Sequence, residues 1–347
     1  MSRTYALLAH PGHNRVYFDQ SQPLHRMELQ AVAGGFAQGA QWRALGGVPY
    51  LAFACEQPLT PEQRRVLESL SFFYAMFELR DGWLQPVEPV GGRYLSESMA
   101  TLLKYSGKTN EQFTALMINL AASLCRTGSP RLSLLDPMSG KGTTLWEALS
   151  RGMDASGVEV NATWHQEACS YAVKFLENAR LKHRVSRSSV PGEKGKRLAD
   201  LFTVRFANTR EAWEADDAHN LTLASADTRH AARCFKKESF DILVCDLPYG
   251  VQHAGKTAAG SKTSAQSDLP ALLDTTLPGW AALMKPGGAL VMSFNEHTLG
   301  RDEAAALCTD HGLRPLYELP YAGYSHRVDQ GIQRDLVCAV KDQEWAG

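Results

Sequence analysis

Two short segments combine residues that could hold a flat base and act on its amino group. The first, Asp246-Leu247-Pro248-Tyr249, follows an apolar run over 240–245 that predicts a buried strand. A carboxylate and a rigid backbone carbonyl can accept the two N–H groups of an exocyclic amine. An aromatic ring can stack on the base face, a contact worth ~1–3 kcal/mol. The second segment, residues 136–144, has the pattern of a strand end, a glycine loop and a helix start. Together the two segments indicate methyl transfer to an amine nitrogen from a nucleoside cofactor.

The glycine loop is expected at the ligand-binding edge of an α/β sheet. In a doubly wound sheet, ligands bind outside the carboxyl ends of the strands, where the strand order reverses, and Asp136 is expected there. Gly140 and Gly142 would let the backbone turn tightly and approach a ligand, and Thr143 or Thr144 would cap the following helix. The loop matches neither a phosphate loop nor G-x-G-x-x-G, which disfavours nucleoside triphosphate and nicotinamide cofactors.

Acidic residues are expected at the ends of the next two strands as well. Glu159 ends the second strand and is expected to accept hydrogen bonds from ribose hydroxyls. Asp227 follows the third strand, where it could accept a hydrogen bond from an adenine amino group. Acidic side chains at three successive strand ends favour S-adenosyl-L-methionine as the cofactor.

The composition is that of an ordinary globular protein. The chain has 347 residues, 44% of them hydrophobic and 21% charged, which is enough for two domains. Its net charge of −1 means that any surface attractive to nucleic acid must be local. Its seven cysteines form no CxxC or Cys/His cluster, so we expect neither a metal site nor disulfides. The chain has no apolar run of about 18 residues and no signal-peptide pattern, which predicts a soluble, cytoplasmic protein without a membrane partner.

The pattern of predicted strands and helices changes near residue 95. Residues 1–95 predict a small α+β domain of ferredoxin-like type, and residues 87–92 a linker. The strands expected in this domain are 5–9, 48–54 and 72–79, and the helices are 27–38 and 61–69.

Residues 96–347 alternate predicted strands and helices, which favours an α/β doubly wound sheet. The strands are expected at 132–135, 155–159, 220–224, 241–245, 289–294 and 336–341. The helices are expected at about 109–125, 144–151, 163–180, 269–284 and 301–311.

Two polar segments interrupt this alternation. Residues 178–210 form a basic insert that is expected as a long connection, either contacting phosphates or remaining a solvated flexible loop. Residues 324–335 predict a hairpin tip. His326 and Arg327, on this tip, would either line a substrate opening or be merely exposed to solvent.

The two motifs resemble those of the amino-methylating, Rossmann-like methyltransferases. The most similar branch comprises the RNA guanine-N2 methyltransferases that usually carry a THUMP domain. Members of that branch often read D-[LMP]-P-[FY]-G, whereas DNA adenine enzymes more often read [DNS]-P-P-[YFW], so Leu247 favours the RNA branch. The leading 95 residues are too short for a ferredoxin-like piece plus a complete THUMP domain, which grips structured tRNA in that branch.

The resemblance also implies roles for particular residues. Asp246 would accept the amine hydrogen bond, the carbonyl after it would accept the second one, Pro248 would fix the turn and Tyr249 would stack on the base. Residues 105–113 resemble the segment that covers the methionine end of the cofactor. With the strand-end residues above, the expected cofactor site comprises Lys108, Thr109, Asn110, Phe113, Asp136, Pro137, Met138, Ser139, Gly140, Gly142, Thr143, Thr144, Glu159, Val160, Asn161, Asp227 and Thr228.

Three substrate classes remain open from the sequence. An exocyclic amine of a nucleic-acid base, above all guanine N2 in RNA, is favoured. The alternatives are a DNA adenine or cytosine amine and a small-molecule or peptide amine. A non-catalytic subunit that only binds S-adenosyl-L-methionine is disfavoured because both motifs are intact. The sequence does not indicate the oligomeric state.

Overall fold

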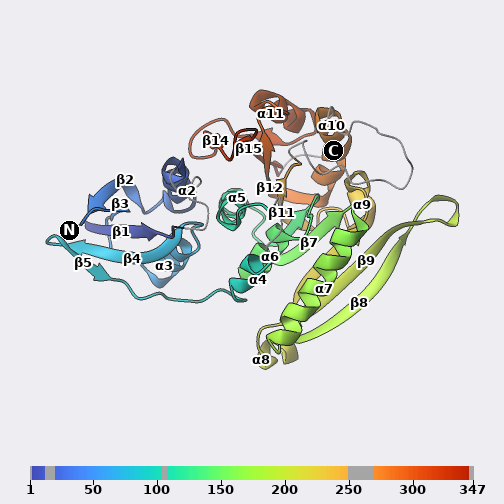
Figure 1. Cartoon of the computed structure of the whole chain (residues 1–347), viewed down its shortest axis with the longest axis horizontal. Coiled ribbons are helices and arrows are strands. Elements are labelled where there is room, and N and C mark those ends of the chain that lie inside the picture. The colour runs from blue at the N-terminus through green and yellow to red at the C-terminus, as the bar shows by residue number, and fades with distance from the viewer. Residues whose placement is uncertain (1, 12–19, 104–107, 249–268, 344–347) are drawn as a thin grey trace.

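The computed structural model describes residues 2–11, 20–103, 108–248 and 269–343 (Figure 1). Two sheets follow one another along the chain, one of five strands and one of ten. Figure 1 shows the five-stranded sheet at one end of the molecule and the larger sheet, with its helices, making up the rest.

The first sheet is antiparallel and has the order β2-β3-β1-β4-β5. Its elements are β1 (Arg3–Ala9), α2 (Gln22–Ala33), β2 (Gln38–Leu45), β3 (Val48–Cys55), α3 (Pro61–Glu68), β4 (Phe73–Arg80) and β5 (Trp83–Pro86). The succession β-α-β-β-α-β, with β1 central, is that of a split βαβ unit of ferredoxin-like type. The predicted strands 5–9, 48–54 and 72–79 are confirmed. Strands β2 and β5 were not predicted because they are edge strands whose residues are largely exposed, so their hydrophobic pattern is weak.

The second sheet has the order β13-β15-β12-β11-β6-β7-β10-β9-β8, and β14 pairs with β15. Its strands are β6 (Ser133–Asp136), β7 (Asp154–Glu159), β8 (Lys182–Pro191), β9 (Arg197–Ala207), β10 (His219–Ser225), β11 (Phe240–Asp246), β12 (Met284–Asn295), β13 (Arg314–Pro315), β14 (His326–Arg327) and β15 (Gln333–Val340). Strands β12, β11, β6, β7 and β10 are parallel, whereas β15, β9 and β8 are antiparallel to their neighbours. The predicted alternation of strands and helices is confirmed, and the architecture is a Rossmann-like, doubly wound sheet.

Helices cover both faces of this sheet. The helices of this part are α4 (Ser98–Thr101), α5 (Glu111–Leu124), α6 (Thr143–Ser150), α7 (Ala162–Asn178), α8 (Arg210–Glu214), α9 (Ala231–Cys234), α10 (Leu269–Leu283) and α11 (Arg301–Asp310), with short 3-10 turns η1 (Glu193–Gly195) and η2 (Thr228–His230). One apolar core packs α5, α6 and α7 on one face, and a second core packs α9, α10 and α11 on the other. The chain reverses its direction of sheet growth at β6, since β7 lies on one side of it and β11 on the other. The ligand-binding edge is therefore expected at the carboxyl ends of β6 and β11.

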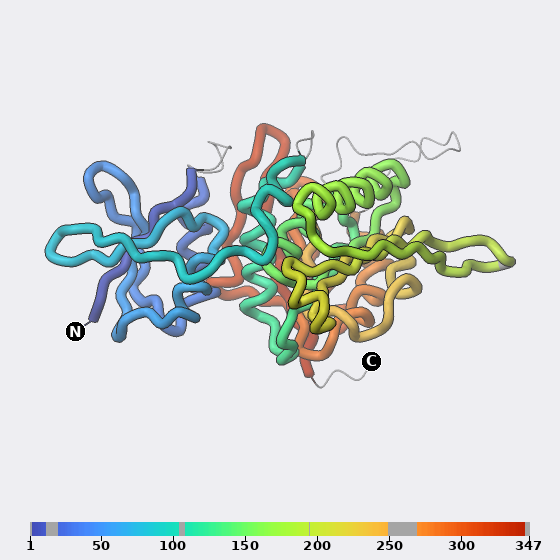
Figure 2. The backbone as a smooth tube through the Cα atoms, turned by 90° about the horizontal axis from the view of Figure 1, so that it is seen from below, coloured from blue at the N-terminus to red at the C-terminus, as the bar shows by residue number. Residues whose placement is uncertain are grey.

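The basic insert differs from the predicted polar connection. After the end of α7, residues 182–207 form the antiparallel hairpin β8–β9, which extends the sheet beyond β10. Figure 2 shows this hairpin reaching out at the end of the molecule opposite the five-stranded sheet. The reason lies in β9, where Phe202, Val204 and Phe206 alternate with polar residues and are buried on the α7 side. The preceding strand β8 is exposed and rich in basic residues, so the segment as a whole reads as polar and the alternation in β9 is easily missed.

A buried polar network joins α2 to the larger sheet. The Glu28 carboxylate accepts hydrogen bonds from the Ser71 amide (2.8 Å), the Ser71 hydroxyl (2.5 Å) and the Asn119 side chain (2.6 Å). Asn119 on α5 in turn accepts from Arg151 (2.5 Å), whose guanidinium also pairs with Glu147 on α6 (2.8 Å). Burial raises the pKa of Glu28, although the hydrogen bonds and the Arg151 charge oppose the rise. Because such buried groups are costly when left unpaired, the network fixes how the two sheets sit relative to each other.

Within the described ranges, no helix combines the length and the apolar character needed to cross a membrane.

Candidate functional site

Asp136 and Asp246 close two neighbouring parallel strands. Strands β6 and β11 pair in parallel, with Leu135 opposite Leu243, so their carboxyl ends lie at the same edge of the sheet. Asp136 is the last residue of β6 and Asp246 the last of β11. The structure thus brings the two sequence motifs together at the point where the strand order reverses.

The Asp246 carboxylate is held on both of its oxygens. The Thr109 hydroxyl donates a hydrogen bond to Oδ2, and the Ser293 hydroxyl donates one to Oδ1. Ser293 is fully buried on β12 and is the register partner of Asp246. Its carbonyl oxygen accepts from the Leu247 N–H (2.9 Å). The two side-chain donors and the backbone hydrogen bond fix the orientation of the Asp246 carboxylate. Ser293 was not identified from the sequence.

The residues after Asp246 leave the sheet in a defined way. The Leu247 side chain is buried in the core, whereas Pro248 is exposed. Tyr249, which was expected to stack on a base, lies outside the described residues, as does the 105–107 part of the segment expected over the cofactor. The buried Leu247 side chain therefore fixes the start of the turn that follows Asp246.

The glycine loop has the backbone geometry that its sequence predicts. Gly140 has φ +53° and Gly142 has φ +92°, both in the left-handed region that favours glycine. A Cβ atom on Gly142 would lie 2.7 Å from the Trp146 ring, so this position admits only glycine. The prediction that Thr143 or Thr144 caps α6 is wrong. Gly142 itself stands at the N-cap, and the Thr144 side chain hydrogen-bonds to Asp136 instead.

The loop is also braced against the second strand. Ser139 is buried, and both its amide and its hydroxyl donate to the Val158 carbonyl (2.9 and 3.3 Å). A Cβ atom on Gly157 would meet the Ser139 side chain at 2.7 Å, so the close approach of loop and strand needs glycine there too. Pro137 is buried and Met138 partly buried at the turn. These side chains position the loop, and its outer side remains open at Gly140, where an added Cβ atom meets nothing within 4 Å.

The carboxylates at this edge influence one another electrostatically. Burial raises the pKa of Asp136 to about 7. Hydrogen bonds from Thr144 and from the Met138 amide oppose that rise, whereas the negative charges of Asp246 and Glu159 add to it. A positively charged group placed among these three carboxylates would relieve their repulsion. The site is therefore suited to a cationic ligand.

Glu159 ends β7 beside the glycine loop. Its carboxylate accepts from the Asn161 amide (2.6 Å) and from the Gly140 and Val160 amides, and burial raises its pKa. Val160 is 68% exposed, which places an apolar side chain on the surface next to this carboxylate. The Asn161 side-chain oxygen accepts two amide hydrogen bonds at the start of α7, so it acts as the helix cap.

Asp227 and Thr228 make contacts within their own neighbourhood. Both Asp227 oxygens accept from the Arg229 guanidinium (2.9 and 2.6 Å), and this hydrogen bonding lowers the pKa of Asp227. The Thr228 hydroxyl accepts from the Trp280 indole N–H (3.1 Å). Any adenine contact of Asp227 would compete with this ion pair.

The segment before α5 serves several structural purposes. The Lys108 ammonium donates to the carbonyls of Ala100 (2.6 Å) and Leu103 (2.7 Å) and to the Glu111 carboxylate. These contacts hold the Lys108 side chain at the start of the helix. The Asn110 side chain caps α5 by accepting from an amide of its first turn (2.9 Å).

Phe113 lies in the core rather than at an open surface. Its ring is fully buried, with the Arg334 guanidinium 4.6 Å from the ring centroid and the His326 ring at 5.1 Å. The predicted hairpin over 324–335 is confirmed, since β14 pairs with β15. His326 is buried, and burial lowers its pKa to about 4, so the ring is neutral at pH 7. Arg327 is exposed, and its amide donates to Gln20 (3.2 Å).

Within the described part of the chain, no group of three or more His, Cys, Asp or Glu side chains could hold a metal ion.

Comparison with known proteins gives one family match and several structural similarities. Residues 106–299 match the model of the UPF0020 family, described as the RMKL-like methyltransferase domain. No curated protein sequence matches significantly. TrmN from Thermus thermophilus is 14% identical, with a TM-score of 0.44, over 98% of this chain and 100% of its own. A TehB-like SAM-dependent methyltransferase from Corynebacterium glutamicum is 14% identical, with a TM-score of 0.35, over 62% of this chain and 83% of its own. A 1,6-didemethyltoxoflavin-N1-methyltransferase from Burkholderia thailandensis, with S-adenosylhomocysteine bound, is 15% identical, with a TM-score of 0.35, over 61% of this chain and 72% of its own.

Proposed function

Because the chain belongs to the family of RMKL-like methyltransferase domains, we propose that it methylates an exocyclic amine of a nucleic-acid base, with guanine N2 in RNA as the favoured target. The family match spans more than half of the chain, and it makes the protein a methyltransferase that uses S-adenosyl-L-methionine. The nature of the amine and the roles of individual residues are part of the proposal.

The described residues fit this cofactor. Asp136, Glu159 and Asp246 converge on a region that suits a positive charge, and the cofactor carries its reactive methyl group on a sulfonium cation. The open outer side of the glycine loop leaves room for a ligand at Gly140. We assign Glu159 to the ribose hydroxyls and the exposed Val160 to contact with the adenine.

The observation that carries the choice of an amine substrate is the fixed Asp246 carboxylate. Thr109 and Ser293 orient it, and the Leu247 carbonyl follows it directly in the chain. A carboxylate and a carbonyl can accept both N–H groups of a planar amine and align its nitrogen lone pair. The bound cofactor would supply the methyl group: the nitrogen would form the N–C bond as the C–S bond breaks, the C–S electron pair would stay on sulfur, and the amine proton would pass to solvent. Asp246 stabilises the positive charge that develops on the nitrogen.

The preference for RNA rests on the sequence Asp246-Leu247-Pro248-Tyr249-Gly250, which resembles the RNA guanine-N2 branch.

Methyl transfer from labelled S-adenosyl-L-methionine to three separate pools tests the proposal. Total RNA, genomic DNA and a small-molecule and peptide extract are each incubated with the protein, hydrolysed and analysed by mass spectrometry. Label in N2-methylguanosine is the expected result. Label confined to the DNA or the small-molecule pool would contradict the RNA target while retaining amine methylation. Absence of label from all three, with cofactor binding intact, would contradict the proposed reaction.

A further inference from the structure

A pocket of about 520 Å³ lies between α7 and the β8–β9 hairpin. The side chains that line it are mainly basic or hydrogen-bonding. They include Gln166, Arg187, Ser188, Ser189, Arg197 and Asp200. Guanidinium groups and hydroxyls are the groups that proteins use to contact phosphate oxygens.

The pocket is lined at the same edge of the sheet where the candidate active site lies. Ser225, which lines it, ends β10 and is the register partner of Glu159 on β7. On its other side Ser225 pairs with Asp200 of β9. Four strand-to-strand steps separate β9 from β11, so at about 4.8 Å a step the pocket lies roughly 19 Å from Asp246.

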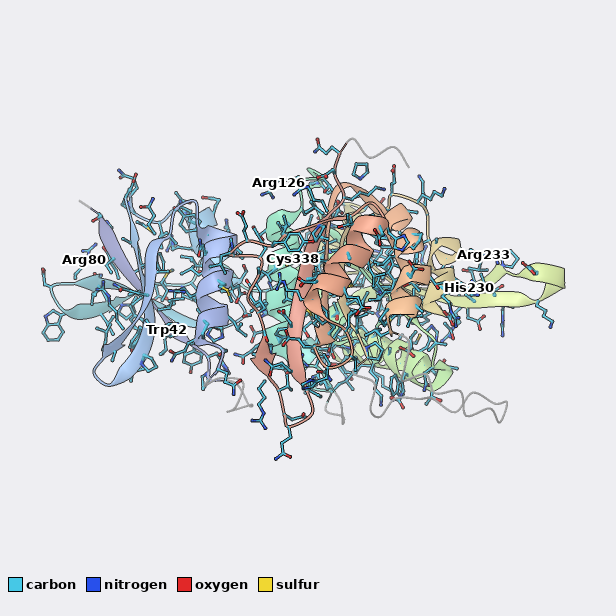
Figure 3. All side chains as sticks on the ribbon, turned by 90° about the horizontal axis from the view of Figure 1, so that it is seen from above. Trp42, Arg80, Arg126, His230, Arg233 and Cys338 are labelled. Carbon is cyan, nitrogen blue, oxygen red and sulfur yellow. The ribbon has the colours of Figure 1, made fainter. Side chains whose placement is uncertain are left out.

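The hairpin that forms the pocket is braced rather than free. Val190 and Leu201 pack against the core on the α9 and α10 side. The Arg233 guanidinium of α9 donates to the Pro191 carbonyl (3.2 Å), and Figure 3 shows Arg233 beside the hairpin. Preorganised groups bind a partner with little ordering cost, so the hairpin presents its charges in a fixed geometry.

Charge is concentrated along this hairpin although the whole chain has a net charge of −1. Lys182, Arg184 and Arg187 are exposed on β8. Because side chains alternate along a strand, Arg187 lies on the pocket face, whereas Lys182 and Arg184 lie on the opposite face. The Arg187 guanidinium lies 5.0 Å from the Phe202 ring centroid, which holds it at the pocket. Arg197 pairs with Asp200 at 2.9 Å on the pocket wall. A local basic surface on a nearly neutral protein favours a polyanionic partner.

We propose that this pocket binds the sugar-phosphate backbone of an RNA strand whose target base lies at Asp246. The inference rests on the proposed function and adds a second contact for the RNA strand, away from the target base. A small amine cannot contact two places roughly 19 Å apart, whereas roughly six nucleotides span that distance at the stacked rise of about 3.4 Å. The cofactor residues lie between these two contacts, so the RNA strand passes along the carboxyl edge of the sheet.

The test uses a fluorescein-labelled 20-nucleotide RNA of mixed sequence and fluorescence anisotropy across a salt series. The variant Arg187→Gln/Arg197→Gln removes two positive charges from the pocket. The control Lys236→Gln/Lys237→Gln removes two from the exposed segment that leads into β11. We expect the pocket variant to bind about tenfold more weakly at low salt, with a salt slope flatter by about 1.4, because each lost phosphate contact contributes about 0.7. The RNA affinity of the control variant should change by less than about twofold. The cofactor affinity of both variants should also change by less than about twofold.

A second pocket variant controls for the case in which Arg187→Gln/Arg197→Gln fails to fold. Ser188→Asp places a carboxylate at an exposed position of the pocket and should weaken RNA binding while the melting temperature stays unchanged. Wild-type RNA affinity in both pocket variants would overturn the inference and leave the proposed function standing. RNA binding that depends on the pocket, without methyl transfer to any RNA, would overturn the proposed function instead. Failure of the wild-type protein to bind the RNA would overturn the inference as well.

Discussion

Ser293 lies directly opposite Asp246 on the neighbouring strand, where its hydroxyl donates to the carboxylate and its carbonyl accepts from the next amide. One buried residue thus holds both the side chain and the backbone of the candidate catalytic turn. Thr109 holds the other carboxylate oxygen from the segment before α5. The orientation of Asp246 is therefore set by two elements that are far apart in the sequence.

Loss of either hydroxyl should slow the reaction, and loss of the Ser293 hydroxyl should do so without weakening cofactor binding. Ser293→Ala and Thr109→Val each remove one hydrogen bond to a charged group, worth about 1.5–3 kcal/mol, so kcat should fall about 10- to 100-fold. Steady-state kinetics and calorimetry with the cofactor separate the two effects. Ser170→Ala, on α7, is the matched control. Unchanged kcat in both variants would show that Asp246 needs no such orientation.

Removal of the Asp246 carboxylate should abolish turnover. Asp246→Ala cannot accept the amine hydrogen bond or stabilise the developing charge, whereas its cofactor affinity should stay within a few-fold of wild type. Asp246→Asn keeps the shape and tests the charge alone. Initial rates with labelled cofactor give the result. Wild-type activity in the alanine variant would rule out the assigned role.

Glu159 should contribute to cofactor affinity rather than to the rate of the chemical step. Glu159→Ala removes the proposed acceptor of the ribose hydroxyls and should weaken cofactor binding by about 1.5–3 kcal/mol. Calorimetry measures this directly. Glu177→Ala, an exposed change on α7, serves as the control. Equal affinities of Glu159→Ala and wild type would remove Glu159 from the cofactor site.

Asp136 should make both stability and cofactor binding depend on pH. Its pKa in the folded protein is about 7. In the unfolded chain a carboxyl of this type titrates near about 3.9. Between these two values the folded state keeps a proton that the unfolded state loses, so this group lowers stability as the pH rises from about 4 to 7. Asp136→Asn should therefore melt at a higher temperature than wild type at pH 8 and at a similar temperature at pH 4.

The cofactor affinity of the wild-type protein should show the opposite pH trend. A sulfonium cation favours the ionised form of Asp136, so cofactor binding should be tighter at pH 8 than at pH 6. The asparagine variant should bind more weakly and lose this dependence. Calorimetry at the two pH values decides between these outcomes, and a wild-type affinity that does not vary with pH would contradict the prediction.

Asn119 should matter for stability rather than for catalysis. Asn119→Ala leaves the buried Glu28 carboxylate and the Arg151 guanidinium each without one partner, which should cost about 1–3 kcal/mol of unfolding free energy. Denaturant unfolding measures the loss. The control Gln112→Ala changes a residue on the same helix as Asn119. It removes only an exposed hydrogen bond from the Gln112 side chain to the His10 carbonyl, so it should cost much less unfolding free energy than Asn119→Ala. Equal stability of the two variants would argue against a role for the buried network.

Much of the fold could be predicted because its strands carry continuous apolar runs and its helices carry caps. Residues 240–245 are such a run apart from Asp241, and α3 begins with a capping box between Thr60 and Gln63. The β8–β9 hairpin was predicted as a long polar connection. The exposed arginines of β8 make the whole segment polar, although β9 alternates regularly between apolar and polar residues. In that case the burial of Phe202 depended on α7, a tertiary partner that local composition does not reveal.

The site could be predicted in outline but not in its contacts. Asp136 and Asp246 follow from strand ends, whereas Ser293 becomes visible only when β12 is paired with β11 in register. A signal for it existed, since a serine in the otherwise apolar run 289–292 and 294 has to find a partner for its hydroxyl. The hydrogen bonds of Lys108 and the full burial of Phe113 could not be predicted from the sequence, because they depend on the final packing.

Strand β8 is the last strand on its side of the sheet in the described part of the chain, and this has a consequence for association. An outermost strand offers unpaired amides and carbonyls to any other strand that approaches, including the same strand of a second molecule. Like charges on Lys182, Arg184 and Arg187 make that approach repulsive between two copies. The hairpin is therefore guarded against self-pairing by the same side chains that make it attractive to an anion. Neutralising them should raise the tendency to aggregate, most of all at low salt, where the repulsion that they supply is least screened.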